Sequence, residues 1–116
     1  MRIILDTNVF ISGIFFSGPP YTILEAWRDG SIQLVISPEI FKEYQRVAEE
    51  LSIKYTGIDI SDVLDLLLVK AEMIDAGTLP ESVSADADDD KFIACAVAGS
   101  LQIIVSGDRH LLDIST

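Results

Sequence analysis

Four acidic side chains, far apart in the sequence, are the candidates for chemistry in this chain: Asp6, Glu43, Asp89 and Asp108. Carboxylate oxygens are hard ligands that select Mg²⁺ or Mn²⁺, and the chain has no cluster of histidines or cysteines for zinc. One or two such ions can orient a water molecule and stabilise the in-line transition state of phosphodiester hydrolysis. His110 is the only histidine, so a mechanism that needs two catalytic histidines is excluded.

Glu43 is the most informative of the four because of its place on a predicted helix. That helix has an apolar stripe made of Ile40, Tyr44, Val47 and Leu51. Glu43 lies three residues after Ile40 and four before Val47, so it is expected to face the buried side. A buried glutamate needs compensation, which a metal ion supplies. The alternative is a glutamate at the edge of the stripe whose carboxylate reaches solvent.

An aspartate-rich segment, residues 86–90, opens another predicted helix. Capping and attraction to the positive end of the helix dipole explain one or two of its aspartates. Asp89 precedes Phe92 by three residues and Ile93 by four, so it continues the apolar stripe of that helix. Asp89 is therefore the predicted third ligand, with Asp90 as the alternative in register.

The remaining candidates each have an ordinary structural explanation beside the functional one. Asp6 follows an apolar run, where an aspartate often forms a turn or caps a helix. Thr7 and Asn8 are turn residues or, alternatively, hydrogen-bond partners that fix the Asp6 rotamer. Gly107 lets the backbone beside Asp108 approach a ligand closely. Three cations are candidates for holding a substrate backbone, or are solvated surface charges: Lys91, Lys42 and Arg46.

The elements that must position these residues follow from the apolar runs and the breaks between them. Strands are predicted over Arg2–Leu5, Gln33–Ile36 and Ile103–Val105, with a short one at Met73–Ile74. Helices are predicted over Tyr21–Arg28, Pro38–Leu51, Asp62–Glu72 and Asp88–Ala98, with Ser37 and Ser61 as caps and a loop over Gly77–Ala85. Continuous apolar strands separated by helices are typical of a parallel sheet covered on both faces. Ligands bind beyond the carboxyl ends of such strands, where Asp6, Ser37 and Asp108 are expected.

Composition indicates one globular domain over residues 1–116. The hydrophobic fraction is 49%, and the single cysteine, Cys95, is expected to be a small buried hydrophobe with no disulfide partner. The apolar run near the amino terminus is interrupted by Asp6 and has no basic stretch, so we expect no signal peptide, no membrane span and a cytoplasmic protein. The net charge of −11 is unusual for a nucleic-acid binder unless metal ions neutralise part of it, and the excess suggests a basic protein partner.

Four segments together resemble the motifs of PIN-domain proteins, and they cover nearly the whole chain. They are Ile4-Leu5-Asp6-Thr7-Asn8-Val9, Ser37-Pro38-Glu39 leading to Glu43, the segment 86–96, and Val105-Ser106-Gly107-Asp108. The resemblance implies a Rossmann-like α/β/α sandwich with a central parallel sheet. It also implies cleavage of single-stranded or structured RNA with Mg²⁺ or Mn²⁺ by the acidic quartet named above, with Asn8 and Ser106 in support.

Within the family, the chain is most similar to toxin components of toxin–antitoxin pairs (VapC-like). That similarity implies an RNA substrate, an antitoxin protein that blocks the site, and a homodimer or higher oligomer. Family members usually continue with another strand and helix, so the domain is expected to be short at its carboxyl end, with a sheet edge that is incomplete or covered by a partner.

Two other functions compete with the ribonuclease. Gly107-Asp108 with Asp113 is similar to the last acidic motif of haloacid-dehalogenase-like phosphatases, with Asp6 as the nucleophile. Those enzymes need an aspartate two residues after the nucleophile, where this chain has Asn8. The other competitor is a non-catalytic PIN-like module that binds a protein partner, against which stands the presence of all four acids.

Overall fold

A parallel sheet of four strands lies at the centre of the computed structural model, which describes residues 1–75, 90–99 and 104–105. The strands are β1 (Arg2–Leu5), β2 (Gln33–Ile36), β3 (Glu72–Met73) and β4 (Ile104–Val105), in the order β3-β2-β1-β4. Each neighbouring pair is parallel, with Arg2 opposite Gln33, Ile4 opposite Ile104 and Val35 opposite Glu72. The predicted parallel sheet is confirmed, and its strands all end at the same edge.

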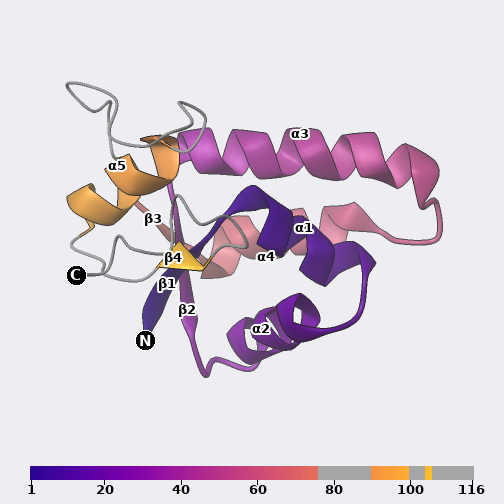
Figure 1. The fold of residues 1–116 in the computed structure, drawn as a ribbon, viewed down its shortest axis with the longest axis horizontal. Helices are drawn as coiled ribbons and strands as arrows, with labels where there is room; N and C mark the ends of the chain where they lie inside the picture. The colour runs from indigo at the N-terminus through magenta and orange to yellow at the C-terminus, as the bar shows by residue number, and fades with distance from the viewer. Residues whose placement is uncertain (76–89, 100–103, 106–116) are drawn as a thin grey trace.

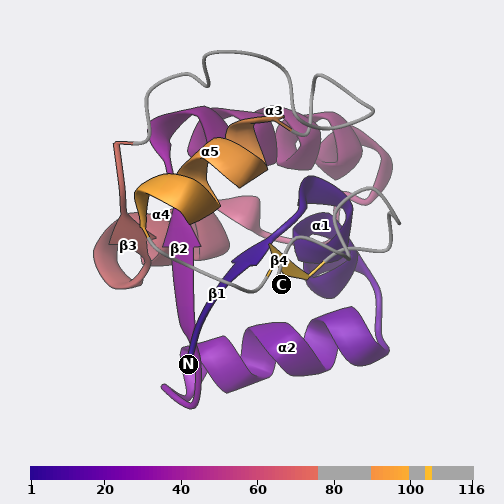
Figure 2. The ribbon, with the colours of Figure 1, turned by 60° about the vertical axis from the view of Figure 1, so that its left-hand side comes forward.

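Helices cover both faces of this sheet. They are α1 (Thr7–Phe15), α2 (Pro19–Arg28), α3 (Pro38–Lys54), α4 (Ile60–Lys70) and α5 (Asp90–Ala98). Figure 1 shows α5 to the left of the strands and α1, α2 and α4 to their right, while α3 runs along the top. In Figure 2, α5 has come forward across β2, which agrees with its place on the face of the sheet opposite α1, α2 and α4. The arrangement is the predicted α/β/α sandwich.

The core lies between the sheet and these helices. Ile4, Leu5 and Val35 have no exposed surface, and Phe92 and Ile93 of α5 are buried against them in the same cluster. Strands covered on both faces have no solvent side, which is why they are continuous apolar runs. Cys95 is fully buried and free, as expected of a small hydrophobe.

Helix α1 is the main feature that the sequence did not predict. Residues 7 and 8 were interpreted as a turn, but they begin a helix that continues to Phe15. Its buried residues, Thr7, Phe10, Ile11, Gly13 and Phe15, cover more than half of the helix circumference rather than one narrow stripe. Because α1 packs against both α2 and α3, its polar side is reduced to Asn8 and Ser12, which is too narrow to produce a clear helical period.

Several helix ends also differ from prediction. Helix α2 begins at Pro19 rather than Tyr21, α3 continues to Lys54, and α4 ends at Lys70 rather than Glu72. Ser61 is not a cap: Asp59 caps α4, and its side chain accepts a hydrogen bond of 2.9 Å from the Ser61 N–H. The short third strand is Glu72–Met73, one residue earlier than predicted.

Other predicted elements lie outside the described residues: the loop over 77–85, the helix start at 88–89 and Ile103. Within the part of the chain that the structure describes, no helix is both long enough and apolar enough to cross a membrane.

Candidate active site

Asp6 lies directly after β1 and is held from two sides. Its side chain is the N-cap of α1 and accepts a hydrogen bond of 2.9 Å from the Val9 N–H. Its own backbone N–H donates to the Val105 carbonyl of β4 at 3.0 Å. Asp6 is only 6% exposed, so a carboxylate is fixed, almost buried, at the carboxyl edge of the sheet. The capping alternative is confirmed, and it places the carboxylate where a ligand of the sheet edge is expected.

Ser37 occupies the equivalent place after β2. Its hydroxyl oxygen accepts a hydrogen bond of 3.2 Å from the Ile40 N–H, so it caps α3 as predicted. Ser37 is 1% exposed and, with Pro38 in the first turn, fixes the direction in which α3 leaves the sheet. This direction carries the next turn of α3 back toward the end of β1.

Glu43 is at the meeting point of three separate segments. The Thr7 hydroxyl at the start of α1 donates a hydrogen bond to Glu43 Oε2. The Lys91 ammonium at the start of α5 lies 2.8 Å from Glu43 Oε1. The Glu43 side chain is 19% exposed, so it lies between the buried and the edge positions considered for it. Since Thr7 follows Asp6 in the chain, Glu43 reaches back to the residues at the end of β1.

Tyr44 ties α3 to the same strand end. Its hydroxyl donates a hydrogen bond to the Leu5 carbonyl, and its ring stacks on Phe10 with centroids 4.2 Å apart and planes 10° apart. Burial, followed by the negative charge of Asp6, raises the pKa of Tyr44 well above 10.0, so its hydroxyl remains a donor. The sequence showed Tyr44 only as part of an apolar stripe. The available signal was that a buried tyrosine needs a partner for its hydroxyl.

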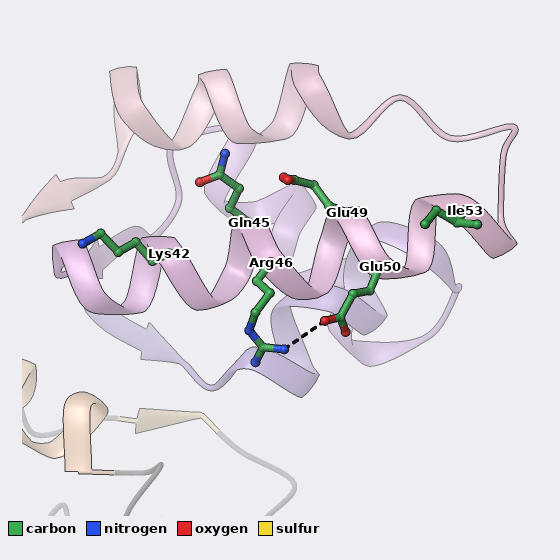
Figure 3. A pocket seen from close by; sticks show the side chains of 6 residues that line it. All are labelled: Lys42, Gln45, Arg46, Glu49, Glu50 and Ile53. Carbon is green, nitrogen blue, oxygen red and sulfur yellow. Dashed lines mark hydrogen bonds and ion pairs between the residues drawn. The ribbon is translucent and has the colours of Figure 1, made fainter.

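The three candidate cations separate clearly. Lys91 is at the site, whereas Lys42 and Arg46 lie on the exposed face of α3. Figure 3 shows both side chains on that face, with Arg46 turned toward Glu50, to which it forms an ion pair of 3.1 Å. The surface-charge alternative therefore describes Lys42 and Arg46. Asn8 is exposed, and its supporting role beside Asp6 stays a prediction.

Asp89, Asp108 and Ser106 lie outside the described residues, as does the side chain of Asp90. Across residues 1–75, 90–99 and 104–105, no group of three or more metal-ligating side chains occurs. Asp6 and Glu43, the two candidate ligands whose side chains are described, nevertheless fit a hard divalent cation. Both present carboxylate oxygens at one sheet edge, and both are mostly shielded from water. Asp6 and Glu43 are the residues that would hold such an ion.

Two surface hollows of the described chain lie away from Asp6 and Glu43. One, of about 500 Å³, runs along the outer face of α3 from Lys42 to Ile53 (Figure 3). Another, of about 570 Å³, is lined by Ile14, Arg28, Ile58, Asp59, Asp62, Val63 and Leu66. Neither includes Asp6 or Glu43.

Comparison with known protein families gives one match. The family model for the PIN domain matches residues 2–110 of the chain. No match was found among curated proteins or among solved structures.

Proposed function

The chain belongs to the PIN-domain family, and on this premise we propose that it is a Mg²⁺- or Mn²⁺-dependent endoribonuclease. PIN domains are generally nucleases and typically use divalent metal ions. The observation that carries the proposal is that the Asp6 side chain caps α1 at the carboxyl edge of the sheet while Thr7, the next residue, donates a hydrogen bond to Glu43. The substrate is single-stranded or structured RNA, whose phosphodiester bonds are hydrolysed.

Each described residue has a definable part in this activity. When bound, Mg²⁺ or Mn²⁺ supplies a water of lowered pKa and positive charge beside the phosphate. The Val9 N–H and the start of α1 hold the Asp6 carboxylate in one orientation, and the Thr7 hydroxyl does the same for Glu43. Fixed ligands lose little conformational entropy when they bind a cation, which favours a preformed site. Asp89, or Asp90, and Asp108 complete the proposed acidic set.

The charge of the chain bears on its partners. A net charge of −11 opposes RNA binding at long range, so the substrate must be held by metal ions and by a few local cations. The same charge favours binding of a basic protein. We therefore extend the proposal to a toxin-type nuclease whose basic antitoxin covers the acidic edge.

A cleavage assay with matched variants tests the proposal. A labelled single-stranded RNA is incubated with the protein and Mn²⁺, beside Asp6→Asn and the control Asp65→Asn. Asparagine also caps helices, so Asp6→Asn keeps α1 while removing a charged ligand. Asp65 is exposed on α4, away from the site.

We expect Mn²⁺-dependent cleavage that falls at least about 100-fold in Asp6→Asn and stays unchanged in Asp65→Asn. Cleavage that survives in Asp6→Asn or in the presence of a chelator would refute the assignment. Hydrolysis of a phosphomonoester in place of RNA would support the phosphatase instead. Folded protein that is inactive toward both substrates would support the protein-binding module.

A further inference from the structure

Both carboxylate oxygens of Glu43 are already engaged. Oε2 accepts the hydrogen bond from the Thr7 hydroxyl, and Oε1 lies 2.8 Å from the Lys91 ammonium. The Lys91 and Glu43 side chains are 21% and 19% exposed, so the ion pair is largely shielded from solvent. The Lys91 ammonium also lies 5.5 Å from the centroid of the Phe92 ring, which adds to the attraction that holds it there.

The position of this ammonium matters because of what Glu43 is proposed to bind. A divalent cation coordinates a carboxylate oxygen at about 2.0–2.6 Å, closer than the ammonium nitrogen lies now. Two cations beside the same oxygen repel each other strongly in a site with little water. Thr7 is neutral and can keep its hydrogen bond to Oε2. Lys91 therefore has to leave Oε1 when a metal ion takes that oxygen.

We propose that Lys91 is a resident counter-ion of Glu43, which occupies the carboxylate until a divalent cation displaces it. The inference rests on the proposed function, since it assumes that Glu43 is a metal ligand. Lys91 then lowers the affinity of the site for metal and prevents Glu43 from being left as an uncompensated, shielded charge. Once released from Glu43, its ammonium lies beside the metal site, where it can contact a phosphate of the substrate.

The geometry favours this role over two simpler ones. A surface ion pair would have both partners in solvent, as Arg46 and Glu50 do with side chains 61% and 62% exposed. A purely structural link between α3 and α5 is already supplied by the apolar contacts of the buried core cluster. The ion pair instead joins the one described cation at the sheet edge to a proposed metal ligand.

Metal binding itself provides the test. The Kd for Mn²⁺ is measured by titration calorimetry for the wild type and for Lys91→Met, Lys91→Arg and Lys42→Met. Lys91→Arg keeps the charge and the ion pair. Lys42→Met removes the same charge from the exposed residue next to Glu43, so it reports the effect of net charge alone.

We expect Lys91→Met to bind Mn²⁺ about three- to tenfold more tightly, because it no longer has to displace an ion pair. Lys91→Arg should remain within about twofold of the wild type, and Lys42→Met also, because solvent screens an exposed charge. Equal or weaker binding by Lys91→Met would overturn the proposal, as would equal tightening by Lys42→Met.

A second measurement on the wild type does not depend on a variant that folds. With ¹⁵N-labelled lysine, the side-chain ammonium signal of Lys91 is followed during a Mg²⁺ titration. We expect it to shift and lose its protection from solvent exchange as the ion pair breaks. A signal that is unchanged at saturating Mg²⁺ would overturn the inference.

Asp6→Asn separates this inference from the proposed function. If Mn²⁺ binding is lost in Asp6→Asn but unaltered in Lys91→Met, the proposed metal site is supported and the proposed role of Lys91 is refuted. Mn²⁺ binding that is absent from the wild type removes both.

Discussion

Tyr44 is the residue through which the stability of the fold and the shape of the candidate site are most directly linked. Changing it to phenylalanine removes one oxygen, the donor to the buried Leu5 carbonyl, and keeps the ring that stacks on Phe10. Leaving a buried carbonyl without its donor costs about 1–3 kcal/mol, and the retained ring loses no packing area. We therefore expect Tyr44→Phe to lower the free energy of unfolding by about 1–3 kcal/mol.

Urea unfolding at neutral pH measures this loss. The only tryptophan, Trp27, is fully buried, so its fluorescence reports the core. Tyr21→Phe is the control: Tyr21 is 46% exposed, and loss of its hydroxyl should change the stability by less than about 0.5 kcal/mol. If Tyr44→Phe were equally harmless, the hydrogen bond to Leu5 could not be what fixes α3 to β1.

The pH dependence of the same variant gives a second readout. Burial raises the pKa of Tyr44 above its ordinary value of 10.0. In the unfolded chain this tyrosine loses its proton near pH 10, while in the folded chain it keeps it. The contribution of Tyr44 to the free energy of unfolding is therefore fully present below pH 10 and falls as the pH rises further. Tyr44→Phe should make that decline shallower, and an unchanged slope would contradict the assignment.

Two further predictions, on Cys95 and on Gly13, test the packing of the core. Burial raises the pKa of Cys95 from 9.0 to about 11. Its thiol should therefore resist a disulfide reagent at pH 8 in the folded protein and react on unfolding. The contribution of Cys95 to the free energy of unfolding should fall as the pH rises through 9 to 11. Rapid stoichiometric reaction of the native protein would show that Cys95 is accessible. Gly13→Ala should lower the free energy of unfolding by about 1–3 kcal/mol, because the added Cβ would lie 2.7 Å from the Pro20 carbonyl oxygen and 2.7 Å from Leu24 Cδ1. Urea unfolding beside Gly57→Ala, where a Cβ meets open space, checks this, and equal effects of the two changes would count against it.

The strands and most helices could be predicted because burial determines their residue patterns. Gln33–Ile36 is wholly apolar after its first residue, and the strand has these bounds in the structure. On α3, the spacing of Glu43 from Ile40 and Val47 predicted a glutamate that faces the buried side, and its side chain, 19% exposed, lies between that position and the edge of the stripe. Local spacing is sufficient where one face of an element is buried and the other is not.

The sequence did not predict elements whose buried residues follow no helical period, or contacts between residues that are far apart in the chain. Helix α1 is buried on several sides, so its residues show no helical stripe. The partners of Glu43 lie 36 and 48 residues away, and only tertiary structure brings them together. For the same reason, spacing along the chain could not distinguish Lys91 from Lys42 and Arg46, although the latter two are closer to Glu43 in sequence.

The position of β1 between β2 and β4 has a consequence for synthesis of the protein. Leu5 pairs with Val105, and the backbone of Asp6 is held by the Val105 carbonyl, so the strand that secures the first acid is synthesised long after that acid. Contacts that span so much of the chain form slowly. Under the proposed function, a partly synthesised chain already carries Asp6 and Glu43 but cannot complete the hydrolytic centre.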